Sequence, residues 1–499
     1  MDLSYGYPVY GIDLTAEMLD QCCGIGVRLL KEVGLRVRHS RFLDVVRKKE
    51  GARVEGERVY FDERLVRRNM ETFVAGQRRR LNGPRPVDLW EAGSSPAANE
   101  EPPEEEWTIR GGGFSMAVID VETDEVRPAT CQDLRDLIRL VESYSIEGNY
   151  PVIPQDIPPL MQAIAVFKIA WESSDRIRCL DYMDKRQTRY IYEMHKVMEK
   201  PFTLFLTVES PMTLSENDLD VFLDFYPDWK RHRDIEFAIL DYPMLGISKP
   251  ITLTGSIAQY IAEEFGVYTL LNLFDPEIEV PVGIPGGIPT DLRHTCWAWG
   301  HPRQHLFAFL NARILPNLCN YEVARYVRDG TLLETSSCAV DEQTALEKMG
   351  IAMMAALQGA RSFGGLGNLC VDDLFSGVQF VIDVEIVDYI KETLQSFNPH
   401  PDVVSMDGIF DMLRDVSLGE EFLLAHPDTA AKFRNILPSS DLLRREKLRS
   451  WLGHKKLLKD RAREECVERI RNQPQFSLPS ETQKALDEIY TRAEEELVG

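Results

Sequence analysis

A group of chemically capable side chains lies between His294 and His305, where three histidines and two tryptophans fall within twelve residues. His301 and His305 would be one helical turn apart, a spacing that suits two ligands of a metal ion. Pro302, however, places His301 at the start of a helix, and no further ligand follows at a fixed spacing. We therefore expect no directly bound metal here and favour hydrogen-bonded structural histidines, with contact to a bound molecule as the alternative.

The two tryptophans of this segment, Trp297 and Trp299, have two interpretations. They are either anchors in the core or walls of a site for a cation, because aromatic faces attract a positive charge. Cys296 and Cys338 keep a third possibility open, a zinc site completed by a histidine.

The scaffold that positions such residues is predicted by apolar runs that alternate with amphipathic stretches after about residue 128. This pattern is typical of parallel strands covered by helices. Seven or more such units without a GxGxxG turn favour a closed barrel over an open nucleotide-binding sheet. We predict an α/β protein with a (β/α)8 TIM barrel, whose strands are residues 149–153, 176–182, 202–208, 236–240, 279–283, 332–336, 361–365 and 403–406.

The chain outside the strands divides into further regions. Residues 1–82 have helical periodicity, with Gly34 as a C-cap, and predict a helical N-terminal extension. Residues 83–110 form an acidic, Pro-rich loop with too few apolar side chains to pack. The barrel occupies 111–416 and opens with a hairpin that turns at Glu122, and residues 417–499 form a C-terminal helical segment for packing or oligomer contact.

Reacting groups of a barrel lie at the C-terminal ends of its strands. Single carboxylates there have an alternative role as helix caps, Asp156 for the helix that follows it and Asp184 for its own. The residues expected at this face are Gln155, Asp156, Tyr182, Asp184, Glu209, Asp241, Tyr242, Gly286, Gly287, Ser336 to Cys338, Gly364, Gly365 and Asp407.

Composition excludes several classes of partner. The formal net charge of -23 opposes nucleic-acid binding, which depends on Lys and Arg, whereas it suits a cationic substrate. No run approaches the roughly 18 apolar residues of a membrane span, and the N-terminus has no signal-peptide pattern, so we expect a cytoplasmic protein. Nine cysteines without a CxxC pair favour reduced thiols.

Several motifs are shared with one known family. A small-residue helix at 252–259, followed by a Pro/Gly-rich turn at 285–289, resembles the core of the trimethylamine methyltransferase family. The agreement spans nearly the whole chain, and the family has a (β/α)8 barrel. Further agreement is found at 29–34, 55–60, 154–159, 340–347, Asp383 with Glu385, and 422–434.

The resemblance implies SN2 transfer of a methyl group from a methylated amine to the Co(I) of a corrinoid held by a separate protein. A quaternary ammonium leaves as a neutral amine, so the site must hold the cation and exclude water but needs no general acid. A carboxylate on the substrate would pair with Arg293 or a nearby histidine. The expected substrate-binding residues are Tyr182, Glu209, Tyr242, Trp297, Trp299 and Phe363, and the expected corrinoid contacts are Gln155, Asp156, Gly286, Gly287 and Ser336.

The family has a pyrrolysine-containing branch and a larger branch without this residue. The chain contains only standard residues and is similar to the second branch, whose substrates are quaternary amines such as glycine betaine, proline betaine and carnitine. Residues 334–343 match the region around the pyrrolysine. We also expect a homo-oligomer.

Departures from the family pattern leave the methyl donor open. Cys23 stands where the first helix of the family usually has a histidine, the Gly-rich turn at 416–419 is reduced, and an acidic insertion occupies 93–106. Two other functions remain: a zinc-dependent barrel methyltransferase, and a quaternary-amine binding protein without catalytic activity.

Overall fold

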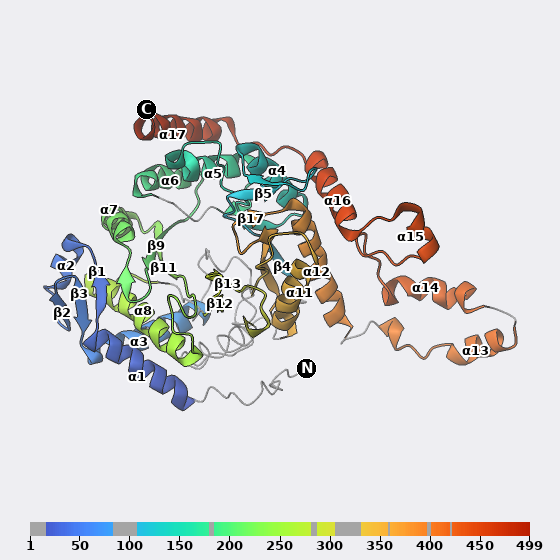
Figure 1. Cartoon of the computed structure of the whole chain (residues 1–499), viewed down its shortest axis with the longest axis horizontal. Coiled ribbons are helices and arrows are strands. Elements are labelled where there is room, and N and C mark those ends of the chain that lie inside the picture. Colours follow the sequence, from blue (N-terminus) through green and yellow to red (C-terminus); the bar gives the residue numbers. More distant parts are fainter. Residues whose placement is uncertain are drawn as a thin grey trace.

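The computed structural model describes residues 16–82, 107–178, 184–280, 287–304, 331–357, 360–396, 401–419 and 422–499. The protein is a mixed α/β structure in which short strands lie near the centre and helices surround them (Figure 1). Within these ranges, none of the helices combines the length and the apolar character that are needed to cross a bilayer.

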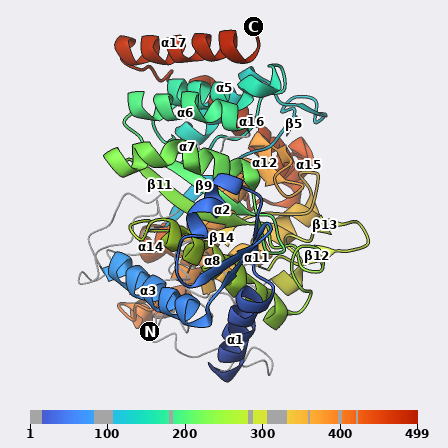
Figure 2. The same cartoon turned by 90° about the vertical axis from the view of Figure 1, so that its left-hand side faces the viewer.

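The N-terminal region consists of three helices and a small antiparallel sheet, which Figure 2 shows facing the viewer. Gly34 ends the first helix with a φ of +73°, and its amide donates to the Leu29 carbonyl over 2.9 Å. An added Cβ would lie 2.6 Å from the Val59 carbonyl oxygen, so only glycine fits. The expected C-cap is confirmed. The elements are α1 (Ala16–Glu32), β1 (Leu35–Val37), α2 (Ser40–Val46), β2 (Ala52–Glu55), β3 (Arg58–Phe61) and α3 (Glu63–Asn82).

This small sheet continues into the first set of parallel strands, and the full order is β11-β9-β10-β1-β3-β2. Strand β9 (Phe202–Val208) runs parallel to β11 (Ile235–Asp241), and β10 (Thr213–Leu214) joins them to β1. Nearly every residue of β9 is buried, as expected for a parallel strand covered on both faces.

Helix α8 (Leu253–Phe274) packs closely against α1. Two glycines permit this approach, because an added Cβ on Gly26 would lie 2.9 Å from the Ile261 side chain, and one on Gly266 would lie 2.7 Å from Leu30. The small-residue character of this part of the sequence therefore serves close helix packing.

A second sheet has five parallel strands in the order β14-β15-β4-β7-β8. Helices follow most of its strands in the chain, which gives βα units. The strands are β4 (Thr108–Gly111), β7 (Glu147–Asn149), β8 (Ile177–Arg178), β14 (Thr331–Leu332) and β15 (Ser362–Leu366), and the helices near the two parallel sheets are α4 (Cys131–Ser143), α5 (Pro159–Ser173), α6 (Lys185–Val197), α7 (Glu216–His232), α11 (Glu342–Leu357) and α12 (Gly377–Gln395).

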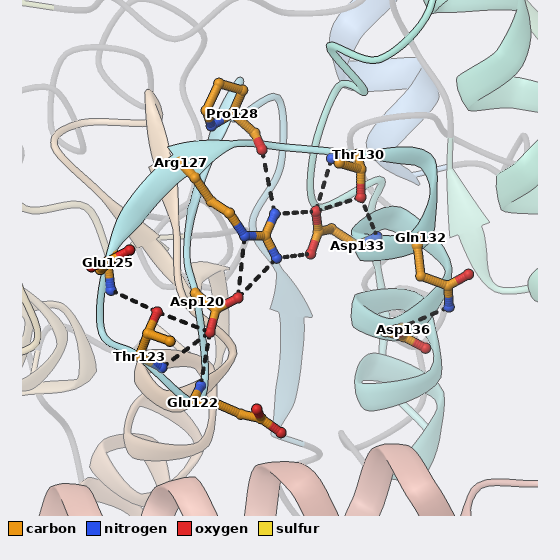
Figure 3. A network of polar contacts seen from close by, with 10 residues as sticks. All are labelled: Asp120, Glu122, Thr123, Glu125, Arg127, Pro128, Thr130, Gln132, Asp133 and Asp136. Carbon is orange, nitrogen blue, oxygen red and sulfur yellow. Dashed lines mark hydrogen bonds and ion pairs between the residues drawn. The ribbon is translucent and has the colours of Figure 1, made fainter.

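The predicted hairpin is confirmed, since β5 (Ala117–Ile119) and β6 (Val126–Pro128) pair antiparallel. Arg127 fixes it to the start of α4 by donating to Asp120 over 3.1 and 3.2 Å and to both oxygens of Asp133 over 2.7 and 2.8 Å (Figure 3). Asp133 also completes a capping box with Thr130. The hairpin lies in a four-stranded sheet with β16 (Asn368–Leu369) and β17 (Leu374–Phe375).

The C-terminal region is helical, as predicted. Its last two helices pack on the body, α16 (Leu458–Asn472) against α12 and α4, and α17 (Ser480–Leu497) against α5 and α6. Between α12 and α16 the chain makes a long excursion that contains α13 (Ile409–Ser417), α14 (Pro427–Ile436) and α15 (Leu448–His454).

The strand predictions have mixed outcomes. The run 202–208 is β9, and the runs 236–240 and 361–365 match β11 and β15 to within one residue at each end. The runs 149–153, 176–182 and 332–336 overlap short strands, with residues 179–182 outside the described part of the chain. The run 403–406 is wrong: Val403 ends a 3-10 helix and the following residues are exposed, because no neighbouring strand is present to pair with them.

The closed barrel is not shown. Among the described residues, the predicted barrel strands that form are divided between two separate sheets, one mixed with six strands and one parallel with five. Residues 279 and 280 carry no strand, and the rest of that predicted strand lies outside the described ranges. Strand β4 was not predicted, because its four residues directly follow the Pro-rich acidic segment.

Candidate functional site

Three of the predicted aromatic residues lie together beyond the end of β11. Tyr242 directly follows this strand and stacks on Trp297, with ring centroids 6.5 Å apart and planes 20° apart. Trp297 meets Trp299 edge to face at 6.1 Å. Trp297 lies in the short hairpin of β12 (Thr290–Asp291) and β13 (Cys296–Trp297), near the centre of Figure 1. The Tyr242 side chain remains 51% exposed, so the cluster is open to solvent.

Ser336 connects this aromatic cluster to the loop after β14. Its hydroxyl is 3.0 Å from the Trp297 carbonyl oxygen and 3.1 Å from that of Trp299, and it has one proton to donate. The Ser336 amide donates to Glu347 of α11 over 3.0 Å. Gly300 packs against the same glutamate, since an added Cβ would lie 2.2 Å from the Glu347 side chain. Both sheets therefore contribute loops to the cluster.

A buried charged group lies next to Tyr242 in the chain. Asp241, the last residue of β11, is 2.8 Å from the Lys249 ammonium, which also pairs with Glu263. Glu263 accepts further bonds from the Ser210 hydroxyl over 3.0 Å and from the Met212 amide over 2.8 Å. Sequence reasoning placed Asp241 at this face but did not find Lys249 or Glu263, because their contacts arise only in the folded chain.

Burial sets the protonation of this group. Burial opposes the charge of Lys249, but Glu263 and Asp241 outweigh it and raise its pKa. Burial also raises the pKa of Asp241, against the effect of Lys249. The neighbouring Glu264 has its pKa raised to about 8, first by burial and then by Asp241. Glu264 is therefore neutral near pH 7, and the two acidic side chains Asp241 and Glu263 face the single ammonium of Lys249.

A second buried polar group lies where β14 and β15 end. Glu334 accepts a hydrogen bond from the Asn368 amide over 3.2 Å, and burial raises its pKa to about 8. Lys348 pairs with Asp383 over 2.6 Å, and Gly367 and Gln379 each donate to that aspartate over 2.8 Å. No local pattern of residues predicts either pair, because the partners are 34 and 35 residues apart.

The other predicted substrate-binding residues either lie apart from the aromatic cluster or fall outside the described residues. Glu209 is exposed, and its carboxylate is 3.8 Å from Arg38. Phe363 is fully buried and stacks on Trp107 with centroids 5.6 Å apart, which is a core contact. Tyr182 lies outside the described residues.

The predicted corrinoid contacts do not form one group. The Gln155 amide donates to the Ile153 carbonyl over 2.9 Å. Asp156 accepts a hydrogen bond from the Cys131 amide over 3.0 Å, so it caps α4. The alternative role that we considered from the sequence was a cap for the helix that follows Asp156. Gly287 is buried, and Gly286 is outside the described ranges. Ser336 alone among them is placed in contact with the aromatic cluster.

The remaining capable side chains have local partners. Asp184 caps its own helix α6, as its alternative interpretation predicted. Arg293 pairs with Asp291 over 2.7 Å, and His301 accepts from the Arg303 amide over 3.1 Å. Among the described side chains, no three His, Cys, Asp or Glu residues converge in a way that would hold a metal ion.

The architecture and the site together define an α/β protein with an aromatic and acidic cluster suited to a cation. The family model of the trimethylamine methyltransferases (MTTB) matches residues 13–498, and the chain belongs to this family.

Individual relatives are more distant. The chain is 26% identical over 339 residues to trimethylamine methyltransferase MttB2 of Methanosarcina mazei, covering 64% of this chain and 63% of the relative's length. It is 22% identical over 440 residues to the glycine betaine methyltransferase of Desulfitobacterium hafniense, covering 83% of each chain. The match thus spans less than two thirds of the length of the first of these relatives.

Proposed function

We propose that this protein takes a methyl group from a quaternary amine and transfers it to the Co(I) of a corrinoid carried by a separate protein. The observation that supports this function is the cluster of Tyr242, Trp297 and Trp299 at the end of β11, next to the buried acidic side chains Asp241 and Glu263. Two relatives of the chain are named for trimethylamine and for glycine betaine, and the second of these compounds carries a quaternary ammonium.

The residues of the chain perform the binding part of such a reaction. Each aromatic face contributes roughly 0.5 to 2 kcal/mol to holding a methylammonium group. The carboxylates around Lys249 add long-range attraction for the positive nitrogen. A quaternary ammonium leaves as a neutral amine, so no side chain has to deliver a proton.

The corrinoid supplies the nucleophile when its carrier protein is bound. Tyr242 is the most exposed ring of the cluster, and a partner would therefore approach from its side. Ser336 is a predicted corrinoid contact that borders the cluster, because its hydroxyl lies within hydrogen-bond distance of the backbone carbonyls of both tryptophans.

We also propose that the two parallel sheets are arcs of one (β/α)8 barrel. Strand β15 pairs in parallel with β4, so the last strand of the second sheet returns to its first. The order β4, β7, β8, then β9 and β11, then β14 and β15 follows the chain, as the strands of a barrel do. An experimental structure with a parallel strand between β11 and β14 would support this arrangement. Open sheet edges at both β11 and β14 would contradict it.

The cation site is tested by replacing Tyr242 and Trp297 with Ala, one at a time. Affinity for tetramethylammonium and for glycine betaine is measured by calorimetry, and methylation of a Co(I) corrinoid is followed by its absorption. Each change should weaken binding by about 2- to 30-fold, the loss of one aromatic face. Tyr389→Ala removes a partly exposed ring from α12 and serves as the matched control.

Two outcomes separate the parts of the proposal. If both variants bind and turn over like the unmodified protein, the cation site is elsewhere. If the unmodified protein binds betaines but methylates no corrinoid, the protein is a binding protein rather than a transferase.

A further inference from the structure

The excursion between α12 and α16, residues 401–457, stands apart from the rest of the molecule, and we refer to it as the arm. Figure 1 shows its helices projecting to the right of the body, away from the aromatic cluster at the centre. None of α13, α14 and α15 contains a buried residue, and Leu442 is the one buried side chain in the described part of the arm.

The arm is rich in apolar side chains that face solvent. Added together, their exposed side-chain area is on the order of 1,500 Å², and a large exposed apolar area often marks an interaction site. A standard stable interface takes about 800 Å² from each partner. These side chains are Val403, Val404, Met406, Phe410, Leu413, Leu418, Phe422, Leu423, Leu424, Phe433, Ile436, Leu437, Leu448, Leu452 and Leu457.

The helices of the arm are too short to be stable by themselves. They have 9, 10 and 7 residues, and isolated helices below about 12 residues are marginal in water. Packing must therefore stabilise them, and the body of the same chain does not supply it within the described residues. We expect another molecule to supply the missing contacts.

The charges of the arm are divided between its two halves. Residues 401–431 contain seven acidic residues and one basic residue, and residues 432–457 contain eight basic and two acidic residues. The basic half is unusual in a chain with a formal net charge of -23. Arg445, Lys447 and Arg449 form no ion pair within the part of the chain that the structure describes.

We propose that the arm binds the arm of a second copy of this chain. A two-fold axis places the same surface on both subunits, so that the acidic half of one arm faces the basic half of the other twice. The apolar side chains are then buried between the two arms. Such a contact explains both the exposed apolar surface and the division of charge, and it does not depend on the proposed function.

Charge reversal in the full-length protein tests this arrangement. One variant carries Asp411→Lys and Asp415→Lys, which leaves residues 401–431 with five acidic and three basic residues. A second carries Arg445→Glu, Lys447→Glu and Arg449→Glu, which leaves residues 432–457 with five basic and five acidic residues. Mass is measured by light scattering on a sizing column at about 0.1 M salt, where charge pairs are incompletely screened.

We expect the unmodified protein to be a dimer or a higher even oligomer, and each variant alone to dissociate at least tenfold more readily. An equimolar mixture of the two variants should associate more readily than either variant alone, because the unchanged basic half of the first then faces the unchanged acidic half of the second. A variant with Lys484→Glu on α17 should associate like the unmodified protein, since that exposed residue lies outside the arm.

Several results would overturn the proposal. One is a monomeric unmodified protein at micromolar concentration. Another is an oligomer that both reversed variants retain, since the contact would then lie elsewhere. A third is an oligomer that withstands Phe410→Ser with Leu424→Ser. Thermal melting of every variant shows whether the body has folded, so loss of association is not confused with unfolding.

Discussion

Replacing Glu334 with Gln should remove a pH-dependent loss of stability. Burial raises the pKa of this carboxyl group from its ordinary value of 4.5 to about 8. Between these two values the unfolded chain has released the proton while the folded chain still holds it. Stability therefore falls as pH rises from about 4.5 to about 8, and the penalty is absent at lower pH.

The size of the effect follows from proton linkage. One group contributes at most about 1.4 kcal/mol for each pH unit within this window, so the upper bound between pH 5 and pH 7 is about 3 kcal/mol. Gln has nearly the same shape, is always neutral, and keeps an oxygen that accepts the bond from Asn368. The variant should therefore gain stability relative to the unmodified protein as the pH rises.

The assay compares urea and thermal unfolding midpoints of the two proteins at pH 5, 6, 7 and 8. Glu488→Gln is the control, because that residue is exposed on α17. The reasoning is refuted if the two midpoint curves stay parallel across this range, since Glu334 would then ionise at the same pH in the folded and unfolded chains.

Three further predictions concern packing and charge. Lys348→Met should lower the free energy of unfolding by about 3 to 5 kcal/mol, because Asp383 would remain buried without its ion partner, and Lys348→Met with Asp383→Asn should recover part of the loss in thermal melts, since Asn is neutral and keeps one oxygen to accept from Gly367. Gly112→Ala should destabilise by about 1 to 3 kcal/mol, since its Cβ would lie 2.2 Å from the Asn368 oxygen, whereas Gly24→Ala meets open space and should not destabilise the protein in the same melts. Asp241→Asn should weaken binding of tetramethylammonium in calorimetry more strongly at low salt than at high salt, and an unchanged affinity at both would contradict a role for this charge.

The predictability of the fold depended on the length of each element. The seven residues of β9, five of them apolar, were found with the correct bounds, because the length of the run and its Phe, Thr and Val residues favour a strand over a helix. The four residues of β4 were missed, and the equally short run 403–406 was wrongly assigned. A short segment becomes a strand only where a neighbour supplies hydrogen bonds, and that neighbour is not visible in the local sequence.

The candidate site was likewise predicted only in part. Tyr242 and Trp297 could be proposed from residue type and position, and the structure places them in contact. Phe363 had the same type and an equivalent position, but its strand turns it into the core against Trp107. The Lys249 and Glu263 pair was not predicted, because a buried lysine looks like any surface lysine until its neighbours are known.

The pairing of β4 with β15 has a consequence for synthesis on the ribosome. Because Thr108 pairs with Ser362, strand β4 gains β15 as its neighbour only after residue 362 has been synthesised. A nascent chain shorter than this leaves a strand edge open, and contacts between such distant positions form slowly. Truncated products that end before Ser362 are therefore expected to aggregate, and newly made chains to depend on chaperones until translation has passed this point.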